Sequence, residues 1–175
     1  MRALSDAGKV RRFMEELGRR ARGPGRVYVT GGATAVLLGW RATTLDVDVK
    51  LDPEPPAAFA AIAALKDELD LNVELAAPDD FIPPLPGWRE HSQFIARYGA
   101  VDFFHYDFRA QALAKIERGH TQDEIDVREF LTRGLVEPGE LGRCFDEIAP
   151  ALLRYPAIDP AEFRSKVAEA LGARP

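Results

Sequence analysis

The sequence predicts an α/β fold in which a small mixed sheet with flanking helices is followed by a C-terminal helical bundle. Three observations lead to this expectation. A run of β-branched and aromatic residues at 27–30 and an alternating run at 45–51 are typical of strands. The apolar run between them, 33–38, is typical of a short helix. A second pair of strand-like runs surrounds a glycine near residue 100. From Phe108 onward the hydrophobic spacing is helical.

The remaining elements follow from turn residues and hydrophobic spacing. Near the N-terminus, five apolar residues recur on one helix face: Val10, Phe13, Met14, Leu17 and Ala21. The proline-rich stretch 76–91 predicts a long rigid loop with four anchoring side chains: Phe81, Ile82, Leu85 and Trp88. The other expected elements are a helix at 57–69, strands at 71–75, 93–98 and 101–106, and helices at 108–118, 122–133, 138–153 and 160–171. We expect residues 1–107 to form the core and 108–175 to form a helical region packed on it, rather than an independent domain.

The composition is that of an ordinary globular protein, with 46% hydrophobic and 29% charged residues in a chain of 175. No apolar run approaches the roughly 18 residues of a membrane span, and the first residues lack the apolar core of a signal peptide. We therefore expect a cytoplasmic protein with no membrane partner. The single cysteine, Cys144, excludes an internal disulfide, and the three histidines lie on different predicted elements, which disfavours a zinc site.

The charge is unevenly distributed along the chain. Residues 1–26 carry eight basic and three acidic side chains, a net charge of +5, whereas the whole chain has a net charge of −5. Two interpretations stay open: the arginines form the solvated face of an amphipathic helix, or they form a docking surface for a polyanion such as RNA.

Two short motifs near the start of the chain have the composition of a phosphoryl-transfer site. Gly31-Gly32 stands at a strand-to-helix turn, where the backbone can approach a phosphate and the helix N-terminus offers N–H groups to it. Asp46 and Asp48 share one strand face with Lys50, and two adjacent carboxylates repel unless a cation lies between them. Their oxygen ligands suit Mg²⁺ or Mn²⁺, which would bridge to substrate phosphates. The alternatives are a tight turn without a ligand and a polar strand face.

A third carboxylate is expected if two metals take part. Glu74, on the strand expected at 71–75, is the first candidate, and Asp102, on the later hairpin, is the second. Either residue could instead be an ordinary exposed strand residue.

A second cluster of charges lies on the helices. Lys115 and Arg118 are one helical turn apart, and Asp123 and Asp126 have the same spacing at the start of the next helix. This pattern is compatible with a capped helix pair carrying a surface salt-bridge network. It is equally compatible with cations that contact a triphosphate and aspartates that orient them.

Taken together, these motifs resemble the nucleotidyltransferase superfamily related to DNA polymerase beta. The likeness is greatest to AbiE-type and minimal nucleotidyltransferases of bacterial toxin–antitoxin and phage-defence systems. It rests on Gly31-Gly32-Ala33-Thr34, on Arg41, on Thr44-Leu45-Asp46-Val47-Asp48 and on residues 114–126, and it spans about residues 27–130. The resemblance implies catalytic roles for Asp46, Asp48, Lys115 and Asp123, nucleotide binding by Gly31, Gly32, Thr34, Arg41, Thr44, Lys50, Arg118 and Asp126, and metal binding by Asp46, Asp48 and Glu74.

The expected function is a Mg²⁺-dependent nucleotidyltransferase that moves a nucleoside monophosphate from an NTP to an acceptor. The acceptor could be RNA, tRNA among its forms, or a protein. The main alternative is a catalytically weak protein of the same fold that binds a cognate toxin or antitoxin. A metal-dependent phosphohydrolase is a third, weaker interpretation, because no histidine stands beside the aspartate pair.

Overall fold

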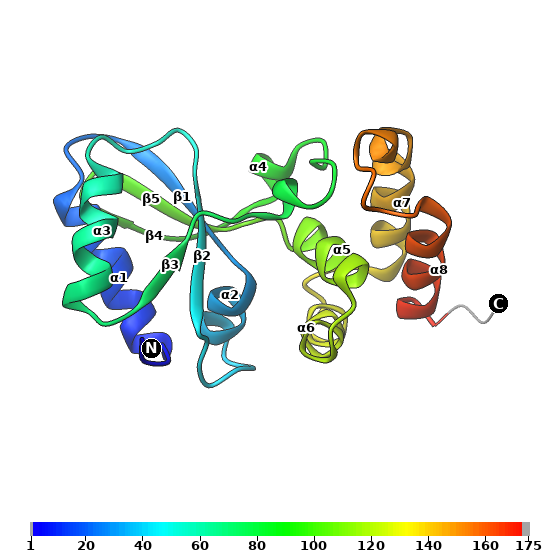
Figure 1. Ribbon diagram of the computed structural model, residues 1–175, viewed down its shortest axis with the longest axis horizontal. Coiled ribbons are helices and arrows are strands. Elements are labelled where there is room, and N and C mark those ends of the chain that lie inside the picture. Colours follow the sequence, from blue (N-terminus) through cyan, green and yellow to red (C-terminus); the bar gives the residue numbers. More distant parts are fainter. Residues whose placement is uncertain (1, 173–175) are drawn as a thin grey trace. The chain divides into compact units, whose positions relative to one another are not determined.

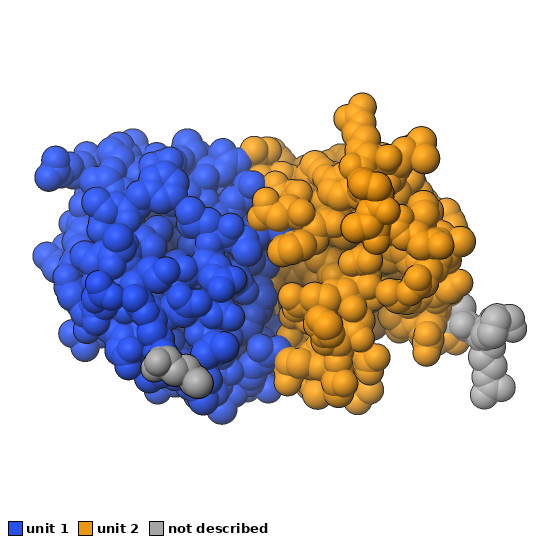
Figure 2. Space-filling model, in the orientation of Figure 1, with its two compact units in different colours: residues 1–77, 92–106 blue, residues 78–91, 107–175 orange. Residues whose placement is uncertain are grey.

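The computed structural model describes residues 2–172, which divide into two compact units. The first unit comprises the residues up to Ala77 together with Ser92–Tyr106, and the second comprises Pro78–His91 together with the residues from Asp107 onward (Figure 2). The expected boundary near residue 107 therefore coincides with a boundary between units. The loop expected at 76–91 belongs almost entirely with the C-terminal helices.

The first unit is built on a five-stranded mixed sheet, as the sequence predicts. Its strands are β1 (Gly25–Thr30), β2 (Asp46–Leu51), β3 (Asn72–Glu74), β4 (Gln93–Tyr98) and β5 (Val101–His105). They are ordered β3-β2-β1-β5-β4 (Figure 1). The β1–β5 and β2–β3 pairs are parallel, whereas β1–β2 and β4–β5 are antiparallel.

Alternation along these strands gives the sheet two different faces. One face is apolar, with Val27, Val29, Val47, Val49 and Phe103 fully buried in the main core. The helices α1 (Ala7–Arg20) and α3 (Ala58–Glu68) pack against this face, and α2 (Gly31–Leu38) contributes Ala33 to the same core (Figure 1). The opposite face, which we call the polar face, carries the intervening residues: Arg26, Tyr28, Thr30, Asp46, Asp48, Lys50, Asn72, Glu74, Phe94, Arg97, Asp102 and Phe104.

The basic N-terminal helix is amphipathic, and much of its charge is paired within the first unit. Asp6 caps it by accepting a hydrogen bond from the Lys9 backbone N–H. Arg20 forms ion pairs with Glu16 and Glu68. Arg2 contacts Asp67 at 2.7 Å, and the Lys9 ammonium donates to the backbone carbonyl of Asp70 at 2.7 Å. These contacts connect α1 and the segment before it to α3 and the residues just after it. They favour a structural role for Arg2, Lys9 and Arg20.

The second unit is helical. It contains α4 (Trp88–His91), α5 (Phe108–Arg118), α6 (Thr121–Thr132), α7 (Pro138–Ile148) and α8 (Pro160–Ala170), with 3-10 turns at Pro78–Asp80 and Ala149–Arg154. The helix expected at 138–153 ends as an α-helix at Ile148, because Pro150 lacks a backbone N–H and disfavours helical geometry in the residue before it. Within residues 2–172 no helix is both long and apolar enough to cross a membrane.

The expected rigid loop is anchored largely as predicted. Ile82, Leu85 and Trp88 are buried, whereas Phe81 leaves 55% of its surface exposed. The segment is also more regular than expected, since it carries both a 3-10 turn and α4.

Candidate functional site

The polar face of the sheet brings the Asp-x-Asp motif next to two neighbouring strands. Asp48 is the register partner of Thr30 on β1 and of Glu74 on β3, while Asp46 pairs with Asn72. Asp46 and Asp48 are both half-buried, so each carboxylate is confined by neighbours but retains access to solvent. The predicted placement of the two carboxylates on one strand face is confirmed.

The double glycine lies directly against this motif. Both glycines belong to α2, which starts two residues earlier than expected, with Thr30 as the extended residue before it. Gly31 has a φ of +62°, and a Cβ at that position would lie 2.5 Å from Asp48 Oδ2. A Cβ at Gly32 would collide with the Thr44 hydroxyl and lie 2.8 Å from Arg41 Nη1. Side chains are thus excluded at both positions, and the first turn of α2 approaches Asp48, Thr44 and Arg41 closely.

Asn72 of β3 links the carboxylates of β2 and β3, and it was not among the site residues predicted from the sequence. Its side-chain amide donates to Asp46 Oδ1 at 2.6 Å and to Glu74 Oε1 at 3.3 Å. The signal was present, because Asn72 precedes Glu74 by two residues and therefore shares its face. The amide fixes the orientation of the Asp46 carboxylate in the direction of β3.

The structure distinguishes the two candidates for a third carboxylate. Glu74 is exposed and lies in register with Asp48. Asp102 lies on β5, in register with Arg26 of β1, and accepts two hydrogen bonds from Arg97 at 2.6 and 2.8 Å. The hydrogen bond from Arg97 holds the pKa of Asp102 below its ordinary value. Glu74 is therefore the residue placed beside the aspartate pair, and Asp102 is occupied in an ion pair.

Among residues 2–172, no three His, Cys, Asp or Glu side chains are grouped so that they could hold a metal ion by themselves. Mg²⁺ in phosphoryl-transfer sites is commonly bound through one or two carboxylates plus substrate phosphates and water. Asp46 and Asp48 fit that incomplete donor set, because both offer hard oxygen ligands on one face of β2 and both keep access to solvent. A metal here would depend on the substrate for its remaining ligands.

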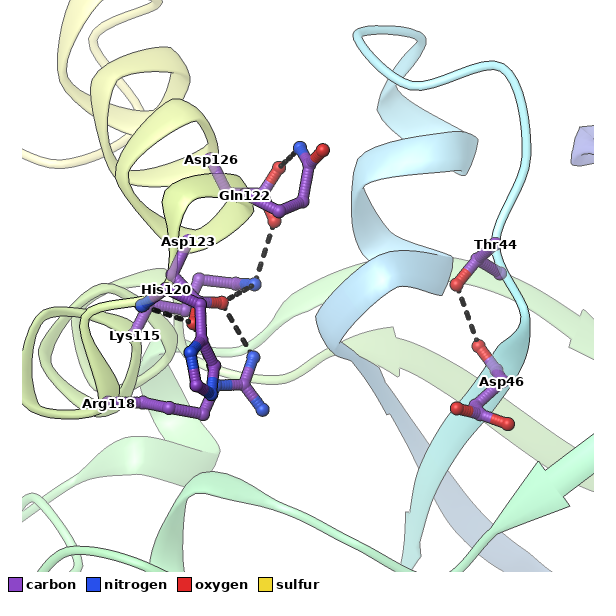
Figure 3. Close-up of polar contacts among 8 residues, drawn as sticks. All are labelled: Thr44, Asp46, Lys115, Arg118, His120, Gln122, Asp123 and Asp126. Atoms are coloured by element: carbon purple, nitrogen blue, oxygen red, sulfur yellow. Dashed lines mark hydrogen bonds and ion pairs between the residues drawn. The ribbon is translucent and has the colours of Figure 1, made fainter.

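The two threonines of the expected site have structural contacts. The Thr44 hydroxyl donates to the backbone carbonyl of Asp46 at 3.0 Å, which fixes the start of β2 (Figure 3). Thr34 is fully buried, and its hydroxyl contacts the Val29 carbonyl at 3.2 Å and His105 Nδ1 at 3.0 Å. Its contribution to a phosphate site is not supported, because the hydroxyl points into the core.

The helical motif forms a buried ionic cluster in the second unit. The Lys115 ammonium contacts Asp126 Oδ2 at 2.7 Å and Asp123 Oδ1 at 3.3 Å (Figure 3). Arg118 adds two hydrogen bonds to Asp123, at 2.6 and 2.7 Å. The side chain of Lys115 is 7% exposed and that of Asp126 is fully buried, so this is not the surface network that was the alternative interpretation.

Each acidic member of this cluster has a further partner from α6 or its N-cap. Asp123 accepts from the His120 backbone N–H at 3.3 Å, and Asp126 accepts from the Gln122 amide at 3.4 Å. Burial raises the pKa of Asp123, but the Arg118 hydrogen bond and the charges of Lys115 and Arg118 outweigh it, so the pKa lies below its ordinary value. With two cations and two anions, the cluster is balanced as it stands and joins α5 to α6.

Comparisons with known proteins give no match to this chain. No family model matches it, and neither the search of curated proteins nor the search of solved structures gives a match.

Proposed function

We propose that this protein is a metal-dependent nucleotidyltransferase that moves a nucleoside monophosphate from an NTP to an acceptor hydroxyl. The observation that carries the proposal is the close approach of the glycine turn to Asp48, one member of the aspartate pair. Gly31 stands so close to Asp48 that any side chain would collide with it. This geometry supports the proposal because a glycine turn at a helix N-terminus suits a phosphate and neighbouring carboxylates suit a divalent cation.

Each part of this arrangement would have a separate task. The first turn of α2 presents backbone N–H groups to the triphosphate, and the absence of side chains allows close approach. Asp46, oriented by Asn72, and Asp48 would hold Mg²⁺ or Mn²⁺. The bound metal would neutralise charge on the reacting phosphate and on leaving pyrophosphate. Glu74 stands in register with Asp48 and would serve as the third carboxylate.

The bond changes of the proposed reaction define the acceptor. The acceptor hydroxyl gives up its proton to water and its oxygen forms a bond to the α-phosphorus. The bond from that phosphorus to the bridging oxygen breaks, and pyrophosphate leaves. The acceptor must therefore carry a hydroxyl, as RNA ends and some protein side chains do. The resemblance also implies nucleotide contacts for Lys115 and Arg118, whose ion pairs within the second unit already balance Asp123 and Asp126.

The proposal is tested by thermal shift with ATP, GTP, CTP and UTP, each with and without Mg²⁺. We expect at least one Mg²⁺–NTP pair to raise the melting temperature of the parent protein, and the Asp46→Ala/Asp48→Ala variant to lose that increase. The matched control removes two exposed carboxylates of the same unit, Glu54→Ala/Asp67→Ala, and should respond like the parent. Absence of any Mg²⁺-dependent shift in the parent would reject the proposal.

A second candidate function is a binding module of the same fold with little or no turnover, pairing with a cognate toxin or antitoxin. Exposed apolar side chains of the second unit favour it, since Phe81 is 55% and Leu153 is 89% exposed. Transfer of labelled nucleotide separates the two candidates, because a module would form a stable complex without transfer.

A further inference from the structure

The polar face carries a row of aromatic side chains immediately next to the aspartate pair. Tyr28 of β1 is in register with Lys50 of β2 and with Phe104 of β5, and Phe104 is in register with Phe94 of β4. The row Lys50–Tyr28–Phe104–Phe94 thus crosses four strands, and we call it the aromatic row. Lys50 follows Asp48 by two residues and Asp46 by four, so the row lies about 7 Å along the strand from Asp48 and about 13 Å from Asp46.

The rings of the aromatic row contact one another in sequence. Tyr28 stacks on Phe104 with ring centroids 5.4 Å apart, and Phe94 meets Phe104 edge-on at 5.6 Å. Tyr28 is fully buried and supports Phe104, which is half-buried, while Phe94 has 56% of its surface exposed. A phenylalanine this exposed at the edge of a supported ring stack offers a rigid apolar surface for a planar ligand.

Cations accompany the rings. The Arg26 guanidinium lies 5.8 Å from the centroid of Phe104, and Arg26 is exposed. Arg97 is 66% exposed despite its ion pair with Asp102. Lys50, at the β2 end of the row, is a third cation. The carboxylates of this face are Asp102, which is ion-paired with Arg97, and Asp46, Asp48 and Glu74 farther along β2 and on β3. The guanidinium groups of Arg26 and Arg97 beside the rings are complementary to phosphates.

We propose that the aromatic row binds unpaired nucleotides of a nucleic-acid acceptor, with bases against Phe94 and Phe104 and phosphates near Arg26 and Arg97. The proposal rests on the proposed function and names its acceptor class. The combination of aromatic faces with cations is the one that single-stranded nucleic acids require, because every base can stack and every phosphate is charged. The proposed contacts run from Arg26 on β1 to Phe94 on β4, two strand spacings or about 10 Å, which is longer than a single base. This extent favours a chain of nucleotides over the base of one NTP.

Fluorescence anisotropy with labelled eight-nucleotide oligo-U and oligo-A tests the proposal on the full chain. We expect Phe94→Ala to weaken binding by about five- to 150-fold, the effect of losing one stacked base. The matched control is Phe59→Ala, which removes another half-exposed phenylalanine from α3 and should leave binding unchanged. Arg26→Gln should weaken binding and lower the salt dependence by about one phosphate contact. Far-ultraviolet circular dichroism verifies that each variant is folded.

The two proposals fail in different ways. If Mg²⁺–NTP shifts the melting temperature but no oligonucleotide binds, or if Phe94→Ala and Phe59→Ala bind alike, the aromatic row is not a nucleic-acid site and the proposed function stands. Transfer of nucleotide to a protein, without oligonucleotide binding, would likewise reject the nucleic-acid site and leave the proposed function standing. If oligonucleotides bind through Phe94 while no NTP binds, the proposed function fails and the surface remains.

Discussion

Removal of Asp126 is expected to be one of the most destabilising single substitutions in the chain. Its carboxylate is fully buried and lies 2.7 Å from the Lys115 ammonium, which is itself only 7% exposed. In Asp126→Ala the ammonium keeps only Asp123, at 3.3 Å, and Asp123 is shared with Arg118. Breaking a buried ion pair by removing one partner costs about 3–5 kcal/mol. For a chain of this length, that corresponds to a melting temperature about 6–20 °C lower.

Urea unfolding followed by circular dichroism, with calorimetry alongside, measures this cost. The control is Asp146→Ala, which breaks the exposed Arg164–Asp146 pair at 3.0 Å and should cost less than about 1 kcal/mol. The double variant Lys115→Met/Asp126→Leu should recover part of the loss, because it removes both buried charges together. If Asp126→Ala costs no more than Asp146→Ala, the cluster is not the ionic link between α5 and α6 that we describe.

Three further predictions follow from buried and close-packed positions. Burial, aided by the positive charge of Arg11, lowers the pKa of His105 from 6.5 to about 4, so the folded state disfavours protonation of the imidazole. The free energy of unfolding should therefore be highest above pH 6.5 and fall by up to about 3 kcal/mol as the pH approaches 4. Urea titrations at pH 7 and 4.5 measure this fall, and His105→Gln should make it smaller. Gly31→Ala should cost more stability than Gly39→Ala in the same titration, because both have positive φ but only Gly31 lies against Asp48; equal costs would refute the close approach. Lys115→Ala should weaken NTP binding in calorimetric titration, and unchanged affinity in the folded variant would limit Lys115 to its structural role.

Much of the fold could be predicted because its signals are local. Alternation places Val47 and Val49 in the core and Asp46 and Asp48 on the opposite face, and the structure confirms both. The end of α7 at Ile148 was missed because helical spacing continues past it, although Pro150 marked the change. Local signals also do not reveal strand order, so the placement of β5 beside β1 required the structure.

The candidate site was harder to predict than the fold. Glu74 could be placed beside Asp48 only once the β2–β3 register was known, and the same register exposed the role of Asn72. Thr34 looked available for a phosphate because it follows the glycines, yet its position on α2 turns its hydroxyl toward His105. The aromatic row combines residues from four strands, and such a juxtaposition has no signature in a single stretch of sequence.

The central claim is that Asp46 and Asp48 support nucleotide transfer, and labelled-nucleotide transfer measures it most directly. The parent protein is incubated with each labelled NTP, Mg²⁺, total RNA and a protein extract, beside Asp46→Ala/Asp48→Ala and the Glu54→Ala/Asp67→Ala control. We predict transfer by the parent and the control, and none by the aspartate variant, which should remain folded because removing two like charges relieves repulsion on β2. Transfer at the parent rate by the aspartate variant would contradict the account.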